Sequence, residues 1–354
     1  MSLAIAAQTS HFLETLATLC AERDRACLLE QFCAGAMAAL CGRSAILFRV
    51  DQGGPVCLLT PIGWCVSDMR GGDWDRNEAV VSKTVADPLL KQVAQPGVRR
   101  QIDAEGDHWR IAWPIGDGRG PHWVVEVRSS VSPDAEVLAG MSGLVRGIDA
   151  LLGQWRHANL DPLTGLLNRR TFDDQFVELI AEAGRLQRGE RVDDAEKKAH
   201  PCWLGIVDID HFKCINDREG HAFGDEVLAF LGGLIKRAFR ANDKVFRFGG
   251  EEFVVMLRDA SEEGVHEIFD RFRAKVAETA FPRGVSVTCS VGYARVDPLC
   301  RPVELVARAD EAMYCAKAKG RNRSLGYEQL VMSGALKALG SGARPHGEAE
   351  LFLG

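Results

Sequence analysis

The most constraining stretch of this sequence is a hairpin with two carboxylates beside its turn, within residues 244–257. Two strand-like apolar runs flank Gly249 and Gly250, a dipeptide that can take positive φ in a tight turn. Glu251 and Glu252 follow at the start of the second strand, where a buried charge is costly unless a cation compensates it. The stretch predicts either a bound metal ion or a solvated turn with two adjacent acids, and these residues alone leave both open.

Length and composition place this hairpin in a chain of more than one domain. The 354 residues suffice for two domains, and contents of 46% hydrophobic and 26% charged residues are typical of soluble globular proteins. A formal net charge of -6 argues against a nucleic-acid partner. We expect no membrane partner and a cytoplasmic location, because no apolar run approaches the roughly 20 residues that span a bilayer and the first residues lack a secretory signal. Eleven cysteines without C-x-x-C spacing are expected to be reduced.

Residues 1–132 have the pattern of an α+β domain. A helical pattern over 11–41 precedes strand-like segments separated by Gly and Pro, at 45–50, 56–66, 108–116 and 122–130. In its order of elements, a helix, an antiparallel sheet and a long exit helix, this half is similar to GAF-type sensory domains. The resemblance rests on topology alone, and it implies a regulatory domain that receives a small-molecule or protein signal of unknown identity.

A signalling helix is predicted over residues 133–158, with Ser132 as its cap and Pro133 at the first helical position. Apolar residues then recur at alternating spacings of three and four, which winds a narrow seam along one face: Leu138, Met141, Val145, Ile148, Leu152 and Trp155. The seam can pack on its own domain. Because the helix leads directly into the next domain, we favour a parallel coiled coil that links two protomers.

A second acidic cluster ends the apolar run 202–209. Asp208 and Asp210 project to the same face of the predicted strand, because side chains alternate. A rigid strand end is a favoured place for a catalytic ligand. An EF-hand is excluded, because its sixth position must be glycine and is Lys213 here.

Polar residues suited to a nucleobase follow this cluster. Asn216, His221 and Asp225 surround Gly220 and Gly224, just before an apolar helix. A carboxylate accepts from the ring N–H and the amine of guanine, and an amide both donates and accepts. Each residue alone also fits a turn or a helix start, so the pattern leaves both roles open.

Several long stretches together resemble the GGDEF-domain diguanylate cyclases. DPLTGLLNRR, DIDHFKCINDREGHAFGDEVL, FRFGGEEF and AKAKGRN have the order and approximate spacing of that family over residues 159–327. The resemblance implies a nucleotidyl-cyclase fold related to the polymerase palm, with a central, largely antiparallel sheet flanked by helices. It implies a nucleotidyltransferase that condenses two GTP into cyclic di-GMP and two pyrophosphates, as a homodimer because each domain holds one GTP. The alternative is a catalytically silent receptor for cyclic di-GMP.

The resemblance also assigns a metal and a base. Asp208, the Ile209 carbonyl and Glu251 would hold Mg²⁺, with Mn²⁺ as a substitute, while Glu252 supports them. Attack of a ribose hydroxyl on an α-phosphate needs a deprotonated nucleophile and a neutralised phosphate, and hard cations on carboxylates supply both. Glu251 would also take the proton.

The remaining implied roles concern nucleotides. The implied substrate-binding residues are Asn216, His221 and Asp225 at the base, Gly249 and Gly250 in the turn, and Phe212, Lys213, Lys317 and Arg321 at the phosphates. Without the family, the last two are ordinary cations at a helix C-terminus. Arg240 and Asp243 match the family's R-x-x-D product-inhibition site, the alternative being a local Arg–Asp pair. Residues 328–354, rich in Gly and Ala, are expected to be a mobile tail.

Overall fold

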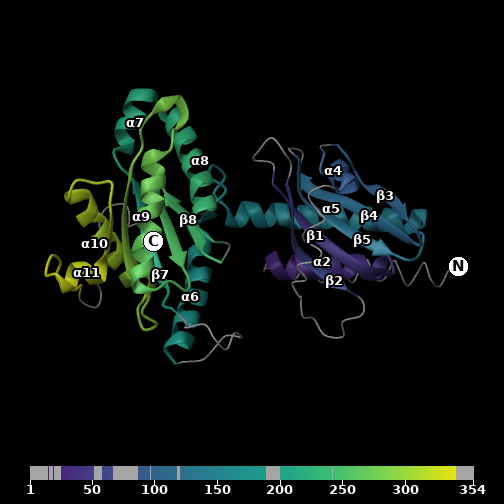
Figure 1. The fold of residues 1–354 in the computed structure, drawn as a ribbon, viewed down its shortest axis with the longest axis horizontal. Helices are drawn as coiled ribbons and strands as arrows, with labels where there is room; N and C mark the ends of the chain where they lie inside the picture. Colours follow the sequence, from purple (N-terminus) through teal and green to yellow (C-terminus); the bar gives the residue numbers. More distant parts are fainter. Residues whose placement is uncertain are drawn as a thin grey trace. The chain divides into compact units, whose positions relative to one another are not determined.

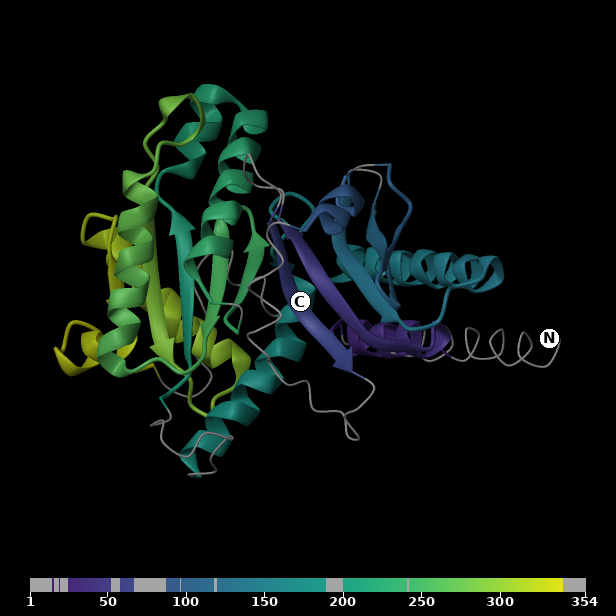
Figure 2. The same cartoon turned by 45° about the vertical axis from the view of Figure 1, so that its right-hand side comes forward.

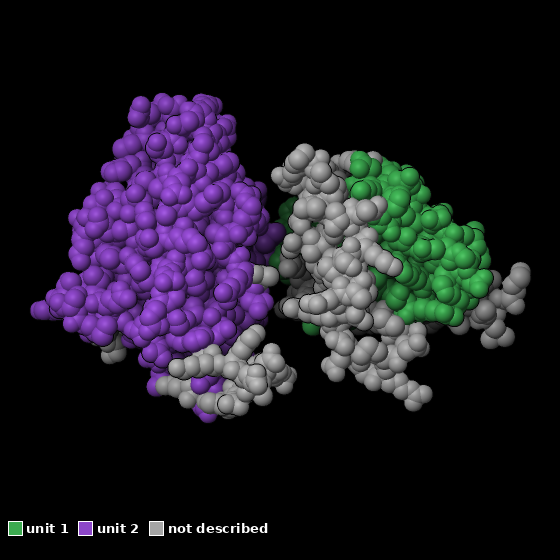
Figure 3. Space-filling model, viewed as in Figure 1, with its two compact units in different colours: residues 1–158 green, residues 159–354 purple. Residues whose placement is uncertain are grey.

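The structure is a computed structural model of the 354-residue chain. It describes residues 15, 19, 25–51, 58–66, 87–95, 97–117, 120–188, 200–240 and 242–339. Figure 3 shows the chain as two compact units, residues 1–158 (unit 1) and residues 159–354 (unit 2). Each unit has its own sheet and its own apolar core.

Unit 1 is built on a five-stranded antiparallel sheet of order β2-β1-β5-β4-β3 (Figure 1). Its strands are β1 Gly42–Asp51, β2 Leu58–Val66, β3 Gln101–Glu105, β4 His108–Asp117 and β5 Gly120–Ser129. Its helices are α2 Arg25–Ala39, α4 Pro88–Val93 and α5 Ala135–Asn159. The apolar residues of β1 alternate between two clusters: Ala45 and Leu47 pack with α2 and α5, whereas Ile46 and Phe48 pack with α4. Both faces of this strand are therefore buried.

Two elements of unit 1 escaped the sequence analysis. Strand β3 is polar and largely exposed, so it lacks the apolar pattern of a strand. Helix α4 is short but carries a start signal, because Asp87 accepts hydrogen bonds from the amides of Leu89 and Leu90 and Pro88 occupies the first helical position. The Asp-Pro dipeptide was the readable clue.

The long helix α5 corrects two expectations. Its N-cap is Asp134, whose Oδ1 accepts from the Val137 amide at 2.8 Å, rather than Ser132 with Pro133 inside the helix. Its apolar seam packs within unit 1 against α2 and strands β1, β4 and β5, where the following residues are 0–8% exposed: Leu138, Met141, Val145, Ile148 and Leu152. Because their own sheet already covers these side chains, they are not available for the coiled coil that the spacing suggested.

Unit 2 contains a six-stranded sheet of order β11-β10-β7-β9-β8-β6. The four inner strands are antiparallel, and the two short edge strands β6 and β11 are parallel to their neighbours. The strands are β6 Leu167–Asn168, β7 Trp203–Ile209, β8 Lys244–Gly249, β9 Glu252–Leu257, β10 Cys289–Arg295 and β11 Ser324–Gly326. The helices are η2 Arg169–Thr171, α6 Phe172–Gln187, α7 Phe212–Glu219, α8 His221–Ala238, α9 Glu262–Glu278, η3 Pro282–Gly284, α10 Pro302–Ala318 and α11 Tyr327–Met332.

Helices cover both faces of the unit 2 sheet, as Figure 2 shows. Val207 and Ile209 of β7 belong to the apolar cluster formed with α7, α8 and α9. Leu204 and Ile206 belong to the cluster formed with α6, α10 and α11. Alternation along β7 therefore assigns Asp208 to the face that carries α10.

Helix α10 lies unusually close to strand β10. A Cβ atom added at Gly292 would overlap the α10 backbone at Ala309 and Met313. The helix presents small buried side chains to the sheet, among them Ala312 and Ala316. The missing side chain at position 292 thus sets how near α10 approaches the sheet.

The segment after Tyr327 corrects a third expectation. Residues 327–332 form α11, in which Tyr327 and Leu330 are buried, and the Leu339 amide donates to the Tyr327 hydroxyl at 2.6 Å. The predicted mobile tail is therefore wrong for residues 328–339, because these leucines and the tyrosine pack on the core. Residues 340–354 lie outside the described part of the chain.

Two further sequence expectations concern cysteines and membranes. Cys33, Cys202, Cys289 and Cys300 are buried, whereas Cys27, Cys41 and Cys214 are exposed. No helix within the described ranges is long and apolar enough to cross a membrane.

Candidate functional site

A buried carboxylate with one unpartnered oxygen lies at the centre of the site. Asp208, near the end of β7, is 4% exposed, and its Oδ2 lies 2.7 Å from Nζ of Lys317. Its Oδ1 is also buried and has no hydrogen-bond partner among the residues that the structure describes. Burial raises the pKa of Asp208 above its ordinary value, although Lys317 acts in the opposite direction. Such an oxygen suits a cation or a donor supplied by a ligand.

The hairpin brings two more carboxylates to this strand end. Gly249 pairs with Glu252, so the central turn residues are Gly250, at φ 46°, and Glu251. The expectation that both glycines form the turn is corrected, because an irregularity after Arg247 shifts the register by one residue. A Cβ atom added at Gly249 would meet nothing within 4 Å, which leaves this edge of the turn open.

The two glutamates differ in position. Glu252 opens β9 and pairs directly with Asp208 across the two strands, on the same face of the sheet. Glu251 is half-buried in the turn itself. The structure thus pairs Asp208 with Glu252, which was expected to have the supporting role, and leaves Glu251 in the turn.

Arg247 fixes this turn, and the sequence analysis missed it. Its Nη2 donates to the Gly250 carbonyl at 2.9 Å, and its Nη1 lies 3.2 Å from Asp161 Oδ2. Asp161 also accepts from the amide and the hydroxyl of Thr164, at 2.8 and 2.7 Å. Burial alone would raise the pKa of Asp161, but the bonds from Thr164 and Arg247 outweigh it and the pKa is lowered. The DPLTG stretch therefore holds the hairpin tip.

Two cations from the far end of the chain reach the same place. Lys317 lies in the last turn of α10, and Arg321 follows Gly320, which has φ 107°. Burial raises the pKa of Asp208, and the charge of Arg321 acts against this rise, as expected of a guanidinium in the neighbourhood of that carboxylate. Lys319 is exposed. The ion pair of Lys317 with a carboxylate was not foreseen, since the sequence assigned this lysine to phosphate.

The nucleobase candidates lie on α7 and α8. Asn216 is half-buried on α7, and its Oδ1 is another buried atom without a hydrogen-bond partner in the described ranges. A Cβ atom at Gly224 would overlap the Asn216 side chain, so the glycine is needed for the side-chain amide of Asn216 to fit there. His221 and Asp225 are exposed in the first turns of α8. These residues lie near one another without forming a closed network.

Helix α7 begins directly after the carboxylate strand. His211, at φ 59°, turns the chain from β7 into the helix. Phe212 is buried in the core and Lys213 is exposed. Their amides belong to the first turn, which has no intrahelical acceptor, and are therefore able to bind an anion.

The R-x-x-D pair lies between α8 and β8. The two oxygens of Asp243 accept from the amides of Arg240, at 2.8 Å, and Arg258, at 3.3 Å. Burial raises the pKa of Asp243, and these two bonds oppose the shift. Arg240 itself is exposed. Asp243 therefore shapes the turn that presents Arg240.

The carboxylates of Asp208 and of the hairpin are the candidate ligands for a divalent metal. The described residues contain no cluster of three or more His, Cys, Asp or Glu side chains ready to hold an ion. Magnesium commonly uses one or two carboxylates and completes its shell with water and substrate phosphates. The unpartnered Asp208 oxygen beside the glutamates of the turn fits that mode. Together with the two cations, these groups have the chemistry that a phosphate-bearing ligand and a hard divalent cation require.

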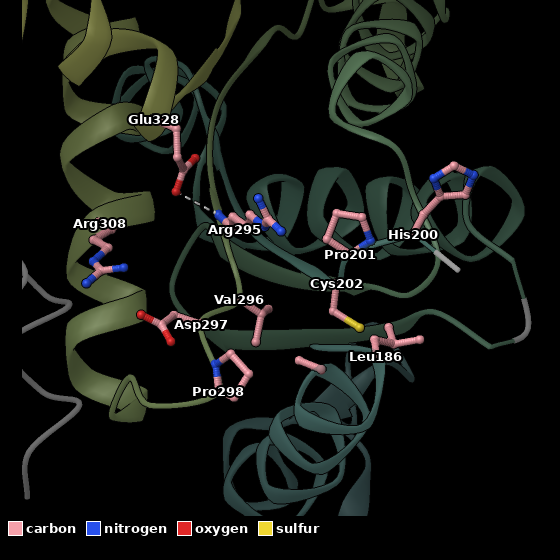
Figure 4. Close-up of a pocket in the computed structure, with 11 residues that line it drawn as sticks. Leu186, His200, Pro201, Cys202, Arg295, Val296, Asp297, Pro298, Arg308 and Glu328 are labelled. Carbon is pink, nitrogen blue, oxygen red and sulfur yellow. Dashed lines mark hydrogen bonds between the residues drawn. The ribbon is translucent and has the colours of Figure 1, made fainter. Parts of the chain in front are cut away.

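A separate cavity of about 520 Å³ lies at the opposite end of the same strands (Figure 4). Cys202 precedes β7 and Arg295 ends β10, whereas Asp208 lies at the other end of β7. Glu328 borders this cavity, and its Oε1 accepts from the Arg295 amide at 3.0 Å. None of the predicted site residues lines it.

Comparisons with known proteins identify the domain family of unit 2. The family model described as "Diguanylate cyclase, GGDEF domain" matches residues 158–323. Over 173 residues the chain is 37% identical to diguanylate cyclase DgcP of Pseudomonas aeruginosa and 36% identical to diguanylate cyclase DosC of Escherichia coli strain K12. These matches cover 48% of this chain but only 24% and 35% of those relatives. Residues 158–323 are therefore a GGDEF domain.

Two solved structures align with part of this chain. The GGDEF domain of DgcB from Caulobacter crescentus, in complex with c-di-GMP, aligns with a TM-score of 0.43 at 30% identity, covering 48% of this chain and 96% of that one. The active GGEEF domain of a diguanylate cyclase from Vibrio cholerae aligns with a TM-score of 0.40 at 32% identity, covering 46% and 97%.

Proposed function

We propose that unit 2 is a diguanylate cyclase that condenses two GTP into cyclic di-GMP and two pyrophosphates. The observation that carries the proposal is the buried Asp208 with its unpartnered Oδ1, beside the carboxylates of the hairpin and the cation of α10. Its membership of the GGDEF domains supports the same reaction. A silent receptor would not need a metal-binding carboxylate, and the presence of Asp208, Glu251 and Glu252 favours the enzyme.

The residues of this chain divide the work of binding and proton transfer. Asn216 and Asp225 read the guanine edge, with His221 beside them, and the first-turn amides of α7 meet the terminal phosphates. Lys317 neutralises Asp208 in this structure and turns to the triphosphate when the nucleotide binds, together with Arg321.

Glu251 has the central chemical role. It lies in the turn with room at the neighbouring Gly249, and it accepts the proton of the attacking 3′-hydroxyl. Asp208, the Ile209 carbonyl and Glu251 would hold Mg²⁺, or Mn²⁺ in its place, with Glu252 supporting them. A bound divalent cation supplies neutralisation of the phosphate charge and a more acidic hydroxyl.

The direct test is incubation of the full chain with GTP and Mg²⁺, followed by mass spectrometry of the products. We expect cyclic di-GMP and pyrophosphate from the wild type. Glu251→Gln should lower turnover at least about a hundredfold, since a positioned base contributes that much or more. Glu263→Gln, at an exposed glutamate of α9, is the matched control and should keep full turnover. A wild type that binds cyclic di-GMP but forms none at any protein concentration would establish the receptor.

We also propose that Arg240 binds the product and inhibits the enzyme. Its exposure, and the turn that Asp243 builds with backbone amides, support a guanidinium held ready for guanine or phosphate. Arg240→Ala should leave the initial velocity intact and raise the cyclic di-GMP concentration for half-inhibition about tenfold. Arg237→Ala, at an exposed arginine in the last turn of the preceding helix α8, is the control. Unchanged inhibition in Arg240→Ala would remove this assignment.

Dimerisation and regulation complete the proposal. Two domains must meet because each holds one GTP, so specific activity should rise with protein concentration. We assign unit 1 to a GAF-like regulatory domain, which its order of α2, antiparallel sheet and exit helix α5 supports. The chain reaches Asp161 two residues after α5, and Arg247 connects Asp161 to the turn by an ion pair and a hydrogen bond, so a change in α5 has a short route to the site.

A further inference from the structure

The chain leaves helix α10 through three successive residues of positive φ. Gly320, Arg321 and Asn322 have φ values of 107°, 61° and 45°. Glycine adopts such values freely, but a non-glycine residue is strained there unless its surroundings hold it. Two consecutive non-glycine residues in this region therefore need support from elsewhere in the fold.

The helix end itself supports only the first of the three. The Arg321 amide donates to the Ala316 carbonyl at 3.0 Å, and the Gly320 amide donates to the Lys317 carbonyl at 3.3 Å. This is the Schellman arrangement, which uses a glycine after the last helical turn. It closes α10 but does not require Asn322 to continue with positive φ.

Asp210 binds the backbone of that third residue. The Asn322 amide donates to Asp210 Oδ2 at 3.0 Å, and the same oxygen accepts from the Thr288 hydroxyl at 2.7 Å. Asp210 Oδ1 accepts from the Ser290 hydroxyl at 2.6 Å. The carboxylate is 5% exposed, and its three donors come from two other parts of the chain. A buried charge bonded in this way fixes its partners firmly.

Arg273 binds the side chain of the same residue from helix α9. Its Nη1 donates to Asn322 Oδ1 at 3.1 Å. The guanidinium of Arg273 also donates two hydrogen bonds to the carboxylate of Asp270, at 2.8 and 3.1 Å, which fix its orientation. Asn322 is thus held through its backbone by Asp210 and through its side chain by Arg273, and Arg321 lies between this anchor and the helix end.

We propose that Asp210 is a positioning residue, which holds the left-handed turn at Asn322 so that Arg321 faces the nucleotide phosphates, and that Arg273 holds the same turn from α9. This inference rests on the proposed function of the site. Asp210 stands two residues from Asp208 with similar burial, but its oxygens are already used by protein donors. It acts through Arg321 and does not touch the substrate.

The experiment measures GTP affinity by calorimetry with Mg²⁺, and KM and kcat by product formation. Asp210→Ala should weaken GTP binding about tenfold, the value of one lost charged hydrogen bond, and raise KM more than it lowers kcat. Asp210→Asn keeps an oxygen for the Asn322 amide and should restore most of the affinity. Ser290→Ala removes a donor but leaves that bond, and is the matched control.

A double variant separates positioning through Arg321 from a direct role. If Asp210 acts through Arg321, the Asp210→Ala/Arg321→Ala protein should bind GTP no more weakly than Arg321→Ala alone. Additive losses, or an Asp210→Ala protein with wild-type affinity, would overturn the proposal. A wild type that binds GTP without forming cyclic di-GMP would contradict only the proposed function, because the binding comparison still holds.

A second route avoids the buried cluster if Asp210→Ala fails to fold. Arg273→Ala removes only the anchor of the Asn322 side chain, and should weaken GTP binding in the same non-additive way with Arg321→Ala. Arg271→Ala, at an exposed arginine of α9, is its control. Equal GTP affinity of the Arg273→Ala and Arg271→Ala proteins would remove α9 from the mechanism.

Discussion

Both units bury a cluster of charged side chains, and the clusters differ in whether their charges are fully paired. In unit 1, Arg110 is 8% exposed and binds both oxygens of Glu126, at 3.0 and 3.1 Å, and Asp87 at 2.7 Å. In unit 2, Asp208 has Lys317 on one oxygen and no partner on the other within the described ranges. We call the cluster around Arg110 closed, because its carboxylates are bonded to the guanidinium, and the cluster around Asp208 open, because one carboxylate oxygen has no partner in the described ranges.

The difference separates structural charges from functional ones. A buried ion pair returns its desolvation cost only when its charged atoms are well bonded, as both oxygens of Glu126 are. The hydrogen bonds and charge of Glu126 raise the pKa of Arg110 against the effect of burial. At Asp208 burial dominates and the pKa is raised, so the fold keeps an expensive carboxylate that its own side chains do not satisfy. The divalent cation proposed at Asp208 would offset that cost.

The largest effect is expected from a substitution in the open cluster of unit 2. Asp208→Asn should lower cyclase turnover at least about a thousandfold, because it removes a charge proposed to hold the metal. Stability should not fall, since a neutral amide costs less to bury than an ionised carboxylate. Turnover assays and thermal unfolding on one preparation check both. A loss of thermal stability together with turnover would mean that Asp208 is structural.

Breaking the closed cluster should have the opposite signature. Glu126→Gln places an amide nitrogen against a guanidinium and should destabilise unit 1 by about 3 kcal/mol, the usual cost of breaking a buried pair. Urea unfolding followed by tryptophan fluorescence measures this, since Trp113 and Trp123 lie in the unit 1 core. Glu136→Gln, at an exposed residue of α5, is the control. A stability equal to that of the control would erase the distinction between the clusters.

The smallest expected effect concerns Glu328, a carboxylate with only one of its two oxygens hydrogen-bonded among the described residues. Burial raises the pKa of Glu328 above its ordinary value of 4.5, and its Oε2 has no hydrogen-bond partner among the described residues. The native state therefore holds a proton more tightly than the unfolded chain, so ionisation of Glu328 destabilises the fold at neutral pH. Glu328→Gln should raise the unfolding free energy by about 1 kcal/mol at pH 7.

This gain should disappear on acidification. As the pH falls through the raised pKa towards 4.5, the wild type takes up its proton and recovers the difference. Urea titrations at several pH values measure it, while turnover stays unchanged because Glu328 lies at the other end of the sheet from Asp208. A gain that is constant with pH would show that packing, not charge, is responsible.

The sequence predicted what local patterns encode. The strand before Asp208, the hairpin and the basic end of α10 were all readable, because apolar alternation and helix-end chemistry are local signals. The turn register was not, since it depends on an irregularity beside Gly249. The seam of α5 has the same spacing whether it meets another helix or its own sheet, so the sequence could not choose.

The residues that hold the site in place could not be predicted from the sequence, for a different reason. Asp210 binds partners 78, 80 and 112 residues away, and Arg247 binds Asp161 from 86 residues away. No periodicity or motif spacing connects such positions. The sequence therefore indicated the groups proposed to contact a ligand, but it did not indicate the groups that hold them in place.

The close approach of α10 to β10 implies a rule for how this domain can vary in evolution. Any side chain at position 292 would push α10 outward, and the ammonium of Lys317 would withdraw from Asp208. A homologue without Gly292 must then compensate with a longer cation at position 317, or with smaller side chains where α10 packs on the sheet. Homologous sequences should therefore covary at 292 and 317, although the two residues never touch the same ligand.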